Sequence, residues 1–134
     1  MSEGVYDLKR FYRKAQKELG LEGWSSDIRW LDAMTYGEYV RSLGGNEGDG
    51  DYSFACTDLS TGNMAYKNIK IRMRIGGCSS QEDAENTIVH ELLHILFWYG
   101  HDGENYHVTV LEEQAMCTID SIVADGIRRR MEKK

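Results

Sequence analysis

The spacing of apolar residues predicts a helix near the N-terminus, followed by a strand. From Tyr6 to Leu19 the apolar residues recur every three or four positions, which is the period of one buried helix face. Gly20 follows at the place where a helix commonly ends, because glycine readily adopts the left-handed conformation of a C-cap. A short strand is expected at 27–31, DIRWL, whereas the stretch from there to Leu43 has no clear period.

Two β-rich runs in the middle of the chain predict a hairpin. YSFACTDL at 52–59 and MAYKNIKIRMRI at 64–75 are separated by the turn residues STGN. Apolar and basic residues alternate in the second run: Ile69, Ile71, Met73 and Ile75 form one set, and Lys70, Arg72 and Arg74 form the other. A period of two predicts one buried and one solvated sheet face, so the basic set is interpreted as a solvated face without chemistry.

After GGCSS the period changes to that of a helix, and two helices are expected. The first should end near Tyr99, before Gly100, and Ser79 and Glu82 at its start have capping-box spacing. The second should span about 109–131, and its expected inward stripe is Leu111, Ala115, Met116, Ile119, Ile122 and Val123. The fold class is therefore α+β: an N-terminal helix, a small mostly antiparallel sheet of about three strands, and two further helices.

Length and charge limit the architecture and the partners. A chain of 134 residues with 41% hydrophobic residues fits a single domain, 1–134, with a sizeable core. The net charge is −6, and the only basic cluster is at the extreme C-terminus, which argues against nucleic acid as a partner. The oligomeric state cannot be deduced from these features.

Cysteine usage and the apolar runs predict the compartment. The three cysteines are widely spaced and form no CxxC pair, which indicates free thiols in a reducing cytosol. The first residues are charged and lack the apolar core of a secretory signal, and the longest apolar stretch is interrupted by His94 and too short to span a membrane. A cytoplasmic protein without a membrane partner is expected.

The segment TIVHELLHILFWYGH, residues 87–101, is almost entirely apolar yet contains the chemistry of a metal site. His90 and His94 are one helical turn apart, with Cβ atoms about 6 Å apart, so two imidazoles can share one tetrahedral ion. Glu91 lies about 100° around the helix, beside the open coordination position. Two core histidines with Glu91 on a solvated edge are the alternative, but burying them without strong partners costs several kcal/mol, about 2–7 per group. We therefore predict a bound Zn²⁺.

A third ligand is expected from the last helix. Glu112 falls inside the expected inward stripe, whereas Glu113 points away from it, and an acid on an apolar face is costly unless it is bound. Glu112 is therefore preferred over Glu113. His101 and His107 are the competing third ligands, as in zinc sites with three histidines.

HELLH followed by LEEQA on a later helix resembles the gluzincins, the thermolysin-like zinc metallopeptidases, and especially their small single-domain members encoded by phages and mobile elements. The resemblance covers roughly residues 50–125 in element order. It implies a zincin-like fold with His90, His94 and Glu112 as zinc ligands and Glu91 as general base. The metzincin pattern is excluded, because Phe97 and Gly100 stand where it needs glycine and histidine. The large second subdomain of full-length relatives is missing.

These residues predict zinc-dependent hydrolysis of a peptide or protein substrate. Glu91 would take the proton of an activated water, and Tyr106 or His107 would be the donor to the developing oxyanion. An extended substrate would pair with the edge strand expected at 52–59. The alternative is a non-catalytic zinc protein that acts by binding a host or phage partner.

Overall fold

The computed structural model describes residues 4–42, 55–58, 66–99 and 110–132; the side chains of 97–99 and 110–113 lie outside that description. Helix α1 (Lys9–Glu18) comes first, and its buried side chains include Phe11 and Ala15. Gly20 has φ +77, and the N–H groups of Gly20 and Leu21 donate to the last turn of the helix. This is the glycine C-cap that the sequence predicts.

The sheet has three strands in the described residues, in the order β1-β3-β2. Strands β1 (Ser25–Leu31) and β3 (Asn68–Arg74) are parallel along seven pairs, and β2 (Ala55–Thr57) is antiparallel to β3. The antiparallel pairing of the two β-rich runs is confirmed. The sheet as a whole is mixed, however, and the expectation of a mostly antiparallel sheet is wrong because the N-terminal strand runs parallel to β3.

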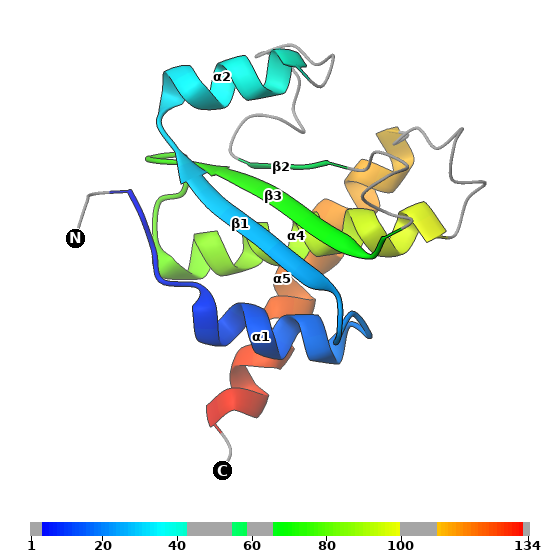
Figure 1. Ribbon diagram of the computed structural model, residues 1–134. Coiled ribbons are helices and arrows are strands. Elements are labelled where there is room, and N and C mark those ends of the chain that lie inside the picture. The colour runs from blue at the N-terminus through cyan, green and yellow to red at the C-terminus, as the bar shows by residue number, and fades with distance from the viewer. Residues whose placement is uncertain (1–3, 43–54, 59–65, 100–109, 133–134) are drawn as a thin grey trace.

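Helices α1, α4 (Gln81–Tyr99) and α5 (Val110–Glu132) lie on one side of the sheet (Figure 1). They enclose the main core with Ile69, Ile71 and Met73, which are fully buried on that face of β3. The predicted buried face of the strand is thus confirmed. In the described part of the chain the fold is α+β, with helices on both faces of a small sheet.

Helix α2 (Ala33–Ser42) covers the opposite face of the sheet, in the stretch where the sequence has no clear period (Figure 1). Tyr36 and Val40 of α2 form a second buried cluster with Cys56 of β2. The basic face of β3 is therefore not simply solvated: Arg72 is only 6% exposed, and its guanidinium donates to the Asp27 carboxylate at 3.0 Å. Its carbon atom Cζ also lies 5.6 Å from the Tyr39 ring centre.

Two local expectations for α4 and α5 need correction. The cap of α4 is formed one residue later than predicted: Ser80 Oγ accepts the Asp83 N–H, and the Asp83 carboxylate accepts the Ser79 N–H. On α5, Met116, Ala124 and Ile127 are buried, whereas Ala115 and Ile122 of the expected stripe are exposed. The inward face of α5 is therefore rotated from the predicted one.

The three cysteines are free, as expected; Cys56 and Cys78 are buried and Cys117 is exposed. Among the described helices, none has the length and apolar character needed to cross a bilayer.

Candidate metal centre

His90, Glu91 and His94 lie together inside the protein. They are 9%, 3% and 5% exposed, and one potential ligand atom from each lies within 4.8 Å of the others. The two imidazole ring centres are 5.0 Å apart. The alternative with Glu91 on a solvated edge is wrong, because this carboxylate is buried beside both rings. One cation can therefore be reached by all three side chains.

Helix α4 makes this cluster because its other faces are filled with apolar side chains. Ile88, Val89, Leu92 and Ile95 are fully buried in the main core. They fix the rotation of the helix, and His90 and His94 therefore share the remaining face one turn apart. The apolar contacts of α4 therefore position the three polar side chains.

Asp120 of α5 orients the first histidine. Its Oδ2 lies 3.1 Å from Nδ1 of His90, and the Asp120 side chain is 17% exposed. A carboxylate can only accept in its ionised form, so neutral His90 presents Nδ1–H to Asp120 and leaves the lone pair of Nε2 for another partner. A carboxylate behind a histidine in this way is a common feature of metal sites.

Thr57 of β2 holds the Glu91 carboxylate. Its hydroxyl donates to Oε1 of Glu91 at 2.6 Å and also lies 3.3 Å from the Glu91 carbonyl oxygen. This contact connects the sheet edge to α4 and restricts the rotation of the carboxylate.

Cys56 of β2, whose pKa is affected by the charge of Glu91, is not expected to bind a metal. Burial raises the pKa of Cys56 to about 12, and the negative charge of Glu91 acts in the same direction. Thiols bind metals as thiolates, so protonated Cys56 is a poor ligand at neutral pH. In the described part of the chain, the donor set is two imidazoles and one carboxylate.

The other predicted site residues are placed only in part. His101, Tyr106 and His107 lie outside the described residues, so the competing ligands and the oxyanion donor stay predictions. Glu112 and Glu113 belong to the first turn of α5, and the description of these two residues covers the backbone alone. Of the edge strand expected at 52–59, β2 forms residues 55–57, at one edge of the described sheet.

Asp120 and Thr57 were not predicted. Asp120 had a usable signal: Met116, Val123 and Ala124 lie one helical turn from it on α5, and an acid near an apolar face requires a partner. Thr57 had no such signal, because threonine is common in strands and its contact with Glu91 depends on tertiary packing. No family model, curated protein or solved structure matches this chain.

Proposed function

We propose that this protein is a zinc-dependent peptidase with its active centre at His90, Glu91 and His94. The observation that carries the proposal is the buried cluster of two imidazoles and a carboxylate, in which Asp120 contacts Nδ1 of His90 as carboxylates do behind metal-binding histidines. Two imidazoles with a carboxylate ligand from α5 suit Zn²⁺, and the Glu91 carboxylate then remains beside the ion for proton transfer. The HELLH motif supports the same reading, by its resemblance to zincin-like gluzincins.

In this proposal His90 and His94 hold the ion, and an acidic residue of α5, Glu112 or Glu113, completes the protein ligands. When bound, Zn²⁺ supplies Lewis acidity, which lowers the pKa of water and polarises a carbonyl group. Asp120 keeps His90 in the tautomer that binds metal and increases its basicity. These roles use one nitrogen from each histidine and need no movement of α4.

Glu91 is the general base, and Thr57 is its positioning residue. The carboxylate accepts the proton of the attacking water and then delivers it to the nitrogen of the leaving amine, so that the peptide C–N bond breaks. The Thr57 hydroxyl donates to Oε1 at 2.6 Å and so fixes the orientation of the carboxylate. Burial of this residue strengthens its electrostatic interactions with the reacting groups.

The substitution Glu91→Gln tests the proposal, because it removes the proton acceptor and keeps the size of the side chain. We expect about one Zn²⁺ per chain in both proteins and at least a ~10²-fold loss of peptidase activity on a mixed peptide library in the variant. Zinc is measured by elemental analysis of purified protein. His90→Ala and His94→Ala are the metal controls and should each lose the ion.

Two results would contradict the proposal. Full activity in zinc-loaded Glu91→Gln protein would remove Glu91 from the mechanism. An inactive wild type with four protein ligands around its zinc would favour the binding-protein alternative, in which the metal is structural.

A further inference from the structure

The outer edge of β1 borders a groove away from the metal centre. β1 lies at one edge of the described sheet, and the strand that contacts Glu91, β2, lies at the other. The groove has a volume of about 610 Å³ and runs between β1, the segment before α1, and α1 itself. Its apolar surface includes Leu8, Tyr12, Ile28, Trp30 and Ile88. This edge is therefore separated from the proposed active site by the width of the sheet.

The backbone of β1 presents unused hydrogen-bonding groups to this groove. In its parallel pairing with β3, the Ser25 N–H donates to Lys67 and the Leu31 carbonyl accepts from Ile75. Residues 25, 27, 29 and 31 therefore face β3, and the N–H and C=O groups of Ser26, Ile28 and Trp30 point outward. None of these three residues makes a backbone hydrogen bond on the outer side within the described chain. The same three side chains line the groove.

The groove is built from fixed parts. The rings of Tyr6 and Trp30 are in contact at 6.1 Å between centres, and the Tyr12 hydroxyl lies 2.8 Å from Ser26 Oγ. The Asp7 carbonyl accepts from the Gln81 side chain at 2.9 Å, which ties the segment before α1 to the start of α4. A preformed groove lowers the entropic cost of binding an extended chain.

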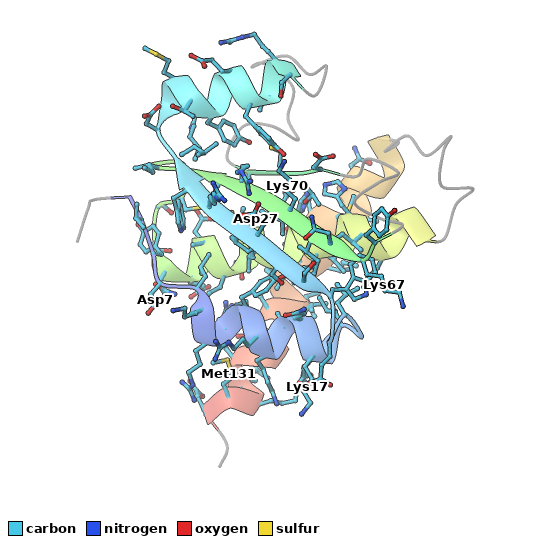
Figure 2. The ribbon with its side chains drawn as sticks, viewed as in Figure 1. Asp7, Lys17, Asp27, Lys67, Lys70 and Met131 are labelled. Carbon is cyan, nitrogen blue, oxygen red and sulfur yellow. The ribbon has the colours of Figure 1, made fainter. Side chains whose placement is uncertain are left out.

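The charge of the groove wall favours an acidic ligand. Lys9, Arg13 and the acidic Asp7 line the groove, so its charged residues are two bases and one acid, and neither base takes part in an ion pair with any described residue. Lys9, Arg13 and Lys17 are spaced one turn apart on α1, and Figure 2 shows Lys17 near the end of the helix, so basic side chains follow its length. A second copy of the chain fits this edge poorly, because pairing two β1 strands brings two basic α1 helices together.

We propose that the outer edge of β1 binds an extended, acidic segment of a partner protein, which pairs as an added strand with the backbone of Ser26, Ile28 and Trp30. Main-chain hydrogen bonds supply affinity in this mode of recognition, and side-chain pockets supply specificity. Every second side chain of the segment enters the groove, and the acidic ones among these lie near Lys9 and Arg13. The inference does not depend on peptidase activity.

The test uses the wild-type chain and a fluorescein-labelled peptide with the repeat valine-threonine-glutamate-threonine, which places valine and glutamate on the same strand face, with binding measured by fluorescence anisotropy. Binding should have the same affinity with added Zn²⁺ and with chelator, because the groove is separate from the metal centre. The same peptide N-methylated at every residue should not bind, since it cannot donate to the strand edge. The same repeat with lysine in place of glutamate should bind at least about tenfold more weakly.

Matched variants test the charge of the wall. Arg13→Glu should weaken binding about fivefold or more, whereas Lys17→Glu, which makes the same charge change on α1 outside the groove, should stay within about twofold of wild type. Circular dichroism confirms that both variants are folded. Equal binding of the N-methylated peptide, binding that requires Zn²⁺ or His90, or equal effects of the two charge reversals would each overturn the proposal. Peptide-competed dimerisation of the chain would overturn it in favour of self-association.

Discussion

The contact between Asp120 and His90 determines which imidazole nitrogen is available for a metal. Replacing Asp120 with asparagine keeps the size of the side chain but removes the charge that favours an Nδ1–H donor. We expect Asp120→Asn to lower zinc affinity by about tenfold to a hundredfold, the range found for outer partners of metal-bound histidines. Competition with a chromophoric chelator measures this affinity.

Asp125→Asn is the matched control for that prediction. Asp125 lies on the same helix and forms an exposed ion pair with Arg129, away from the histidines. It should retain wild-type affinity. If both asparagine variants bind zinc equally well, Asp120 has no role in orienting His90.

At the scale of elements, the observed inward face of α5 changes the expected third ligand. Met116 and Ala124 are buried on that face, and Asp120 reaches His90 from it. Counted from Asp120 at 100° per residue, position 113 lies about 20° away and position 112 about 80° away. The preference for Glu112 was based on a stripe that included exposed Ala115 and Ile122. Helix geometry now favours Glu113.

We therefore expect Glu113→Gln to lose zinc affinity more than Glu112→Gln. A lost ligand should cost at least as much as a lost outer partner, about tenfold or more. The two variants have the same change of charge at adjacent positions, so each serves as the control for the other. A loss of zinc affinity in Glu112→Gln alone would identify Glu112 as the third ligand.

The ion pair between buried Arg72 and half-buried Asp27 should make stability depend on pH. Figure 2 labels Asp27 on β1 beside Lys70, the residue opposite it on β3. The hydrogen bond from Arg72 is the chief cause that holds the pKa of Asp27 below its usual value. The pair therefore stabilises the fold above the ordinary aspartate pKa of about 3.9. That contribution is lost as the pH falls through the lower pKa of the folded state.

Urea unfolding at about pH 7 and about pH 3 measures the effect. Wild type should lose more free energy of unfolding between the two conditions than Asp27→Asn does. The double variant with Arg72→Met completes a mutant cycle, and its pH dependence should match that of Asp27→Asn. An unchanged pH dependence in Asp27→Asn would show that this pair does not contribute.

The sequence predicted those parts of the fold and site that depend on local spacing. Gly20 ends α1 as expected, and His90 and His94 share a helix face because their separation is one turn. Alternation in β3 predicted two different faces but could not show that α2 covers the second one, which left Arg72 interpreted as solvated. Asp120 and Thr57 reach the site from α5 and β2, and such contacts are set by packing between distant segments.

At the scale of the whole molecule, zinc should stabilise the fold if it binds only the folded chain. A free concentration of one hundred times Kd adds about 2.7 kcal/mol, which corresponds to roughly 10 °C in the midpoint of thermal unfolding for a domain of this size. Calorimetry with zinc and with chelator measures the shift. His90→Ala should show almost no shift, and an equal shift in that variant would indicate binding elsewhere.

The parallel pairing of β1 with β3 also has a consequence for the kinetics of folding. Each pair in this ladder joins residues 43 positions apart, for example Ser25 and Asn68, whereas β2 and β3 join residues that are much closer in sequence. Contacts between distant segments form slowly, because the chain loses loop entropy before they stabilise it. We therefore expect the β2–β3 pair to form early and the addition of β1 to limit the folding rate.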